Sequence, residues 1–221
     1  MTLAEGETDR LVDALERRIA RRYDLELRHR VREFVLHDAE TLHALSGAER
    51  GSEEVVLLRE GDGELEFTLY LSASVCARAV RALAQRELGD GGLDALCTLV
   101  EGVSHGVCVL WHARHARELR PLDLELQAEI DKYLVLSHDL GVGGALARAL
   151  FERVRYTAAP GSALEARYRR ANGHAARYCR WLERRFPARG AREGLRAELA
   201  RFYRLSGHAK ARRIERCRPH R

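Results

Sequence analysis

Apolar residues recur at every second position over residues 64–71, and they recur at helical spacing over most of the remaining chain. A period of two predicts a strand with one buried face and one solvated face. The apolar positions of this predicted strand are Leu65, Phe67, Leu69 and Leu71. Gly61, Asp62 and Gly63 are typical of a tight turn, and residues 55–60 form a second run before it. We therefore predict an antiparallel hairpin.

The segment before this hairpin contains a weaker strand signal. Residues 31–36 are rich in residues that favour strands, so we predict a third strand there, although a helix would also fit this pattern. Apolar spacing and a capping residue predict a helix over residues 9–23. A short helix is expected over residues 39–45, ended by a glycine. Residues 1–8 are expected to be frayed.

The pattern after residue 72 is helical, and glycines and prolines divide it into segments. The predicted helices are residues 74–88, 93–116, 121–137, 145–156, 162–186, 191–205 and 207–215. Strands followed by helices indicate an α+β fold. We expect a small three-stranded antiparallel sheet near the N-terminus followed by a predominantly helical bundle. With 221 residues, the chain is expected to be a single domain, residues 1–221, with subregions 1–72 and 73–221.

Charge is distributed unevenly along the chain. Residues 1–140 carry 17 basic and 27 acidic side chains, a net charge of −10, whereas residues 141–221 carry 21 basic and 6 acidic, a net charge of +15. Such asymmetry indicates an anionic partner, either a nucleic acid or an acidic protein. The alternative is that the acidic part neutralises the basic part within the fold. Arginine outnumbers lysine by 36 to 2, which is typical of a GC-rich bacterial genome and weakens arginine content as an argument by itself.

Cysteine usage and hydropathy bear on localisation. The five cysteines are odd in number and include no C-x-x-C pair, which argues against a disulfide scaffold or zinc ribbon and for a reducing, cytoplasmic compartment. The first ten residues carry three acidic side chains, unlike a signal peptide. The most apolar window, residues 93–111, contains Asp94, Glu101 and His105, so no membrane partner is expected.

A basic stripe is predicted on the helix over residues 162–186. Its members recur at steps of three and four residues, so they share one face of the helix. They are Arg167, Arg170, His174, Arg177, Trp181 and Arg184. Guanidinium groups suit phosphate and carboxylate groups, and the indole of Trp181 could stack on a base or on a neighbouring arginine. The alternative is an ordinary solvated helix face or pairing with the acidic N-terminal part of the chain.

A second candidate site lies on the helix over residues 93–116. Glu101 and His105 are four residues apart, as are Glu125 and Glu129 on the next predicted helix. If these two helices face each other, the four side chains could bind a divalent metal. Cys108, His112 and His115 continue the first stripe, and the two histidines are expected in solvent near the helix end. The alternative is a surface stripe or a hydrogen-bonded pair in the core.

Two glycines, Gly102 and Gly106, interrupt the same apolar helix. Glycine in a helix interior costs about 1 kcal/mol relative to alanine, so close packing of another backbone or a ligand against this face is expected. We weigh packing above a ligand.

These observations favour a non-enzymatic, cytoplasmic bacterial interaction protein that docks an anionic macromolecule through the basic stripe. No catalytic residues and no cofactor are expected, because no nucleophile, phosphate-binding or dinucleotide motif is complete. The alternative is a helical enzyme or ligand-binding protein in which a divalent metal is held by the Glu/His stripe.

Overall fold

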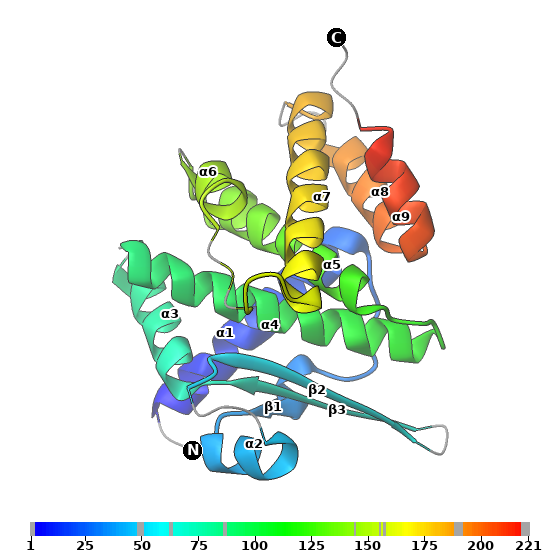
Figure 1. Ribbon diagram of the computed structural model, residues 1–221. Helices are drawn as coiled ribbons and strands as arrows, with labels where there is room; N and C mark the ends of the chain where they lie inside the picture. The colour runs from blue at the N-terminus through cyan, green and yellow to red at the C-terminus, as the bar shows by residue number, and fades with distance from the viewer. Residues whose placement is uncertain are drawn as a thin grey trace. The chain divides into compact units, whose positions relative to one another are not determined.

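The computed structural model describes residues 3–47, 51–61, 64–85, 88–143, 145–154, 156, 158–187 and 192–217. These residues belong to two compact units (Figure 1). The first unit is Met1–Arg17 with Leu27–Arg117, and the second is Arg18–Glu26 with Glu118–Arg221. The predicted α+β class is confirmed, because a small sheet precedes a series of helices. That the chain is a single domain stays a prediction.

The first unit contains the sheet and the helices that cover it. Its elements are α1 (Leu3–Tyr23, as far as Arg17), the 3-10 helix η1 (Val31–Phe34), β1 (Val35–Leu36), α2 (Ala39–Ser46), β2 (Glu54–Gly61), β3 (Glu64–Leu71), α3 (Ala73–Gln85) and α4 (Asp90–Arg114). The predicted turn residues Asp62 and Gly63 lie outside the described residues. The helix α1 begins at Leu3, so the prediction that residues 1–8 are frayed is wrong from Leu3 onward.

The three strands are arranged in the order β1-β3-β2. Strands β2 and β3 form the predicted antiparallel hairpin, with Val56 opposite Leu69. Strand β1, however, is parallel to β3, with Val35 opposite Leu69, so the expectation of a wholly antiparallel sheet is wrong for this pair. Most of the predicted strand over residues 31–36 is the 3-10 helix, and only two residues pair with β3. A segment this short shows no periodicity from which its direction could be predicted.

The burial of β3 follows the predicted alternation in its middle and differs from it near both ends of the strand. Phe67, Leu69 and Leu71 are buried as predicted, but Leu65 is 38% exposed. Leu65 lies opposite Glu60 in the outer part of the hairpin, where β2 is exposed as well. Tyr70, predicted to face solvent, is buried. Burial and the nearby Asp38 at the start of α2 raise the pKa of Tyr70, and Figure 1 shows α2 on the side of the sheet opposite α4.

The glycines of α4 lie where the helix meets the rest of the unit. A Cβ atom on Gly102 would lie 2.8 Å from Cδ2 of Leu71 and 3.3 Å from Cδ1 of Leu69. A Cβ atom on Gly106 would lie 2.6 Å from Cγ1 of Val31. Both distances are shorter than a normal contact between carbon atoms. Close packing, and not a ligand, therefore accounts for both glycines.

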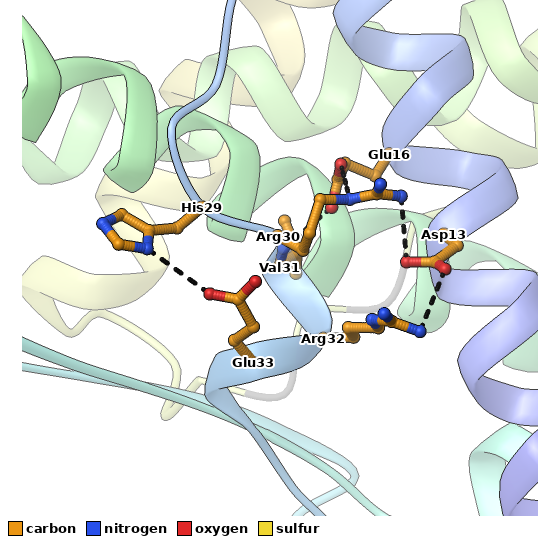
Figure 2. A network of polar contacts seen from close by, with 7 residues as sticks. All are labelled: Asp13, Glu16, His29, Arg30, Val31, Arg32 and Glu33. Atoms are coloured by element: carbon orange, nitrogen blue, oxygen red, sulfur yellow. Dashed lines mark hydrogen bonds and ion pairs between the residues drawn. The ribbon is translucent and has the colours of Figure 1, made fainter.

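A polar network positions Val31 against α4 (Figure 2). The buried carboxylate of Glu16 accepts the backbone N–H of Val31 at 2.7 Å and lies 2.8 Å from Nε of Arg30. Arg30 and Arg32 also bind Asp13, one turn earlier on α1, at 3.1 Å and 3.4 Å. Burying a carboxylate is costly unless it is paired and hydrogen-bonded, and Glu16 is both. The network thus fixes the entry to η1.

The second unit is helical in its described residues. Its elements are Arg18–Tyr23 of α1, α5 (Pro121–Leu134), the π-helical turn η2 (Val135–Asp139), α6 (Leu146–Phe151), α7 (Ala163–Arg185), α8 (Arg192–Tyr203) and α9 (Gly207–Glu215). The helices agree with the predicted segments to within a few residues, except that α6 ends at Phe151 and not at Tyr156. Figure 1 shows α8 and α9 side by side next to α7.

The end of α1 lies in the core of this second unit. The hydroxyl of the fully buried Tyr23 donates to Oδ1 of Asp131 at 2.5 Å, and its ring lies 4.7 Å from that of Tyr203. Burial raises the pKa of Tyr23 well above its ordinary value, so the hydroxyl stays protonated and donates. Arg204 caps the end of α1 by donating to the carbonyl oxygen of Tyr23 at 2.8 Å.

Replacing the two kinds of helical glycine should change stability in opposite directions. Gly106→Ala should lower the free energy of unfolding by about 1–3 kcal/mol, because the added methyl overlaps Val31. Gly173→Ala in α7, where no atom lies within 4 Å of the added methyl, should raise it by up to about 1 kcal/mol. Urea denaturation measures both. If both substitutions changed the free energy of unfolding in the same direction, the packing argument would be contradicted.

Truncation of two neighbouring positions on β3 should separate the covered part of the hairpin from its exposed end. Phe67→Ala should cost about 3–5 kcal/mol because the ring is buried against the ring of Phe34, 5.4 Å away. Leu65→Ala should change stability by about 0.5 kcal/mol or less. Thermal and urea unfolding of both variants measure the difference, and similar losses would show that the outer hairpin is packed as well.

Candidate functional site

The helix α7 begins and ends as its sequence predicts. The hydroxyl of Ser162 caps it by accepting the N–H of Glu165 at 3.1 Å. Its last residue is Arg185, two residues before Pro187. One face, which includes Ala171, Ala175, Tyr178 and Leu182, is fully buried. The predicted basic stripe lies beside that face.

Three arginines of the stripe are exposed and evenly spaced. Arg170, Arg177 and Arg184 are seven residues apart, which places them on one line of the helix at intervals of about 10.5 Å. Within the described part of the chain, none of the three forms an ion pair. Their guanidinium groups are therefore open to a partner.

Arginines on the other faces of α7 behave differently. Arg169 binds Glu165 one turn earlier, with 2.6 Å between Nη2 and Oε1, and Arg180 binds Glu152 at 2.9 Å. These acidic residues neutralise arginines beside the stripe and leave Arg170, Arg177 and Arg184 unpaired among the described residues. Glu165 and Glu152 belong to the basic part of the chain, so these two pairs are not the predicted neutralisation by the acidic residues 1–140.

His174 lies between the exposed arginines and is half-buried. Burial lowers the pKa of His174, and the positive charges of Arg170 and Arg177 lower it further, whereas Glu215 opposes this effect. The imidazole is consequently neutral near pH 7, and the stripe owes its charge to arginine alone.

Two predicted members of the stripe have partners in the second unit. Nε of Arg167 lies 3.9 Å from a carboxylate oxygen of Glu125, a long ion pair. The half-buried ring of Trp181 lies under the guanidinium of Arg213, whose Cζ is 4.4 Å from the ring centroid. Arg213 is in turn held by Glu198 at 2.8 Å. Of the two predicted contacts of Trp181, a base or a neighbouring arginine, the structure shows the arginine, which covers one face of the ring.

The helix α9 extends the basic surface beside α7. Arg213 of α9 covers Trp181, so the two helices are neighbours. Arg212 and Arg216 are exposed, and neither forms an ion pair with a described residue. Burial raises the pKa of the Cys217 thiol at the end of α9, whereas Arg213 and, to a smaller extent, Arg177 and Arg184 lower it. We call the set Arg170, Arg177, Arg184, Arg212 and Arg216 the basic face.

The four predicted metal ligands are divided between the two units. Glu101 and His105 belong to the first unit, and Glu125 and Glu129 to the second. Nδ1 of the buried His105 lies 3.0 Å from Oε1 of Glu54, a residue with no part in the predicted ligand set. A site that uses both pairs stays a prediction.

Both glutamates of the second unit have basic neighbours. Glu129 accepts hydrogen bonds from Lys132 at 2.9 Å and from Asn172 at 3.1 Å, so each of its oxygens has a partner. Glu125 faces Arg167. A metal ion would have to displace these partners or share the carboxylates with them.

The rest of the α4 stripe is structural. His112 is buried, which contradicts the expectation that it lies in solvent, and its Nδ1 lies 2.8 Å from the backbone oxygen of Cys108. The ring of Trp111 packs edge-on against it, so the helix end is covered there. His115 is exposed as predicted.

Helix α4 is long and apolar enough to span a membrane between Gly91 and Arg114, by length and composition only. Most of that stretch is buried within the protein, as in any core helix. It therefore gives no support to a membrane role.

Two cavities of the second unit were not predicted from the sequence. One, of about 320 Å³, lies among α7, α8 and α9 and is lined by Trp181, Phe186 and Arg201, among others. The other, of about 290 Å³, includes Tyr133, His138 and Cys179 and also touches Phe186. The π-helical turn that carries His138 is a type of distortion found frequently at functional sites. Their lining residues come from separate helices, so no local motif marks them.

Comparisons of the chain with protein-family models, with curated proteins and with solved structures found no match.

The titration of His174 should report the charges of the stripe. Its pKa, measured by NMR, should lie below the ordinary value of 6.5. Arg170→Ala should raise this pKa by removing a nearby positive charge, but it should stay below the ordinary value because burial is the larger cause. Arg180→Ala, on another face of α7, is the control and should leave it unchanged.

The lowered pKa of His174 also makes the stability of the protein depend on pH. Because the unfolded chain binds the His174 proton more tightly than the folded chain, stability is lost as pH falls from the unfolded pKa toward the folded one. His174→Gln should reduce that loss in urea denaturation measured across this pH range. An unchanged pH dependence would contradict the assigned direction of the shift.

Proposed function

We propose that the second unit binds the phosphate backbone of a nucleic acid through the basic face. The observation that carries this proposal is selective pairing: Arg169 and Arg180, on other faces of α7, have acidic partners, and the exposed arginines of the stripe have none among the described residues. The residues of the second unit include 26 basic and 14 acidic side chains, a net charge of +12, so an anion is attracted to the whole unit.

The character of the basic face favours a nucleic acid over an acidic protein. Protein interfaces depend on buried aromatic or aliphatic anchors, with charged groups at the rim. In the described part of α7, α8 and α9 the one exposed large hydrophobic side chain is Leu164, at the start of α7. A surface of arginines without apolar anchors suits a partner whose affinity is mainly electrostatic, as it is for a phosphate backbone.

The geometry also favours contacts to the backbone over contacts to bases. Guanidinium groups bind phosphate oxygens bidentately, and an exposed row on one rigid helix can track successive phosphates. Base stacking requires an aromatic face that is free, and Arg213 covers one face of Trp181. We therefore expect duplex binding with little sequence preference, and no chemical step.

Salt dependence of duplex binding tests the proposal. Each phosphate contact contributes about −0.9 to the slope of log affinity against log salt, so five arginines should give a slope of about −4.5. The triple variant Arg170→Ala, Arg177→Ala and Arg184→Ala should reduce it to about −1.8 and weaken binding at low salt. Fluorescence anisotropy of a labelled duplex measures both quantities.

A matched variant separates this surface from total charge. Arg17, Arg28 and Arg81 are exposed residues of the first unit, and replacing all three by alanine removes the same charge. This control variant should retain most of the slope of log affinity against log salt. Equal losses in the two triple variants, or no detectable duplex binding at low salt, would overturn the proposal.

A further inference from the structure

The cavity among α7, α8 and α9 combines apolar walls with unpaired positive charge. Its volume is about 320 Å³, at the small end of the range for ligand pockets. The rings of Trp181 and Phe186 form one wall, nearly perpendicular to each other with centroids 5.9 Å apart. Arg185 and Arg201 also line it, both exposed, and neither forms an ion pair with a described residue.

Small residues on α8 make room for this cavity. A Cβ atom on Gly194 would lie 3.1 Å from Cε1 of Phe186, so the glycine lets this ring lie close to the helix. Ala197, three residues later on the same side of α8, also lines the cavity. Larger side chains at these two positions would occupy the space that is open.

The remaining charges of the cavity neutralise each other. Glu198 lies 2.8 Å from Nη2 of Arg213 and also accepts a hydrogen bond from the hydroxyl of Tyr178 at 3.3 Å. Arg213 and Glu198 therefore cancel, and Arg185 and Arg201 leave the cavity with a net charge of +2. A cation is disfavoured, and a small anion is attracted.

We propose that this cavity binds a nucleoside monophosphate or an equally small aromatic phosphate. Arg213 lies over a face of Trp181, and Arg185 lies over the ring of Phe186 with its Cζ 5.3 Å from the centroid. The planar ring would therefore lie against the edges of these two aromatic side chains, and the phosphate would bind Arg201 and Arg185. Aromatic walls favour a flat ring, and guanidinium groups favour phosphate oxygens. The ligand could be a free mononucleotide or the phosphorylated end of a strand, because both present this chemistry.

The indole N–H resonance of Trp181 provides a direct test in the full-length protein. The chain has two tryptophans, and Trp111→Phe identifies which indole signal belongs to Trp181. Addition of adenosine monophosphate should shift that signal with saturation. Adenosine lacks the phosphate and inorganic phosphate lacks the aromatic ring, so each should bind at least about tenfold more weakly than the monophosphate.

Two variants locate the binding site. Arg201→Ala should weaken binding of the monophosphate about tenfold or more while leaving adenosine unaffected, and Ala197→Leu should abolish binding of both by filling the cavity. Arg192→Ala is the matched control, an exposed arginine of α8 that does not line the cavity. Circular dichroism confirms that the helices of each variant are retained.

The outcomes separate this site from the basic face. Arg201→Ala and Ala197→Leu should leave most duplex binding intact, and the triple variant of α7 should leave monophosphate binding intact. Tighter binding of a 5′-phosphorylated single strand than of its unphosphorylated form identifies a strand end as the ligand, and equal binding of the two strands identifies the free mononucleotide. A signal of Trp181 that does not move, an equal effect of Arg192→Ala, or inorganic phosphate that binds as tightly as the monophosphate would overturn the proposal.

Discussion

The first unit depends on how closely α4 can approach the sheet and the 3-10 helix. Gly102 and Gly106 bring the backbone of α4 into contact with β3 and with Val31, at distances that a methyl group would not allow. The polar network of α1 serves the same contact, because the carboxylate of Glu16 holds the backbone N–H of Val31. The segment of η1 and the two-residue strand β1 is thereby held by the buried carboxylate of Glu16 and by the close approach that Gly106 allows.

The second unit is governed more by how its charges are matched. Two polar pairs hold its helices together, the hydrogen bond between Tyr23 and Asp131 and the ion pair between Arg213 and Glu198. Its surface carries arginines in excess, whereas the residues of the first unit have a net charge of −7, from 12 basic and 19 acidic side chains. An Arg-rich genome explains the number of arginines but not why Arg170, Arg177 and Arg184 lack ion-pair partners among the described residues. This difference in pairing is the reason to assign the surface a function.

Long periodic segments could be predicted from the sequence, because helical spacing over three or more turns is hard to mistake. Nearly every helix was predicted from this spacing, and the hairpin was predicted from its period of two and its turn residues. The direction of β1 and the burial of Tyr70 could not be, because they depend on which element covers a face and not on the local pattern. The same limit applies to the candidate site. The spacing of Arg170, Arg177 and Arg184 predicted a shared face, but the covering of Trp181 by Arg213 joins residues 32 positions apart.

The path of α1 has a consequence for dissecting the protein. Its first part belongs to one unit and Arg18–Glu26 to the other, so neither unit is a continuous stretch of chain. A fragment that starts at Glu118 would contain Asp131 and Tyr203 but would lack the Tyr23 side chain that both contact. During synthesis, the segment that completes the second unit is made almost a hundred residues before the helices it joins. Helix α1 must therefore stay available until the helices that carry Asp131 and Tyr203 have been made, and its removal would damage the basic second unit.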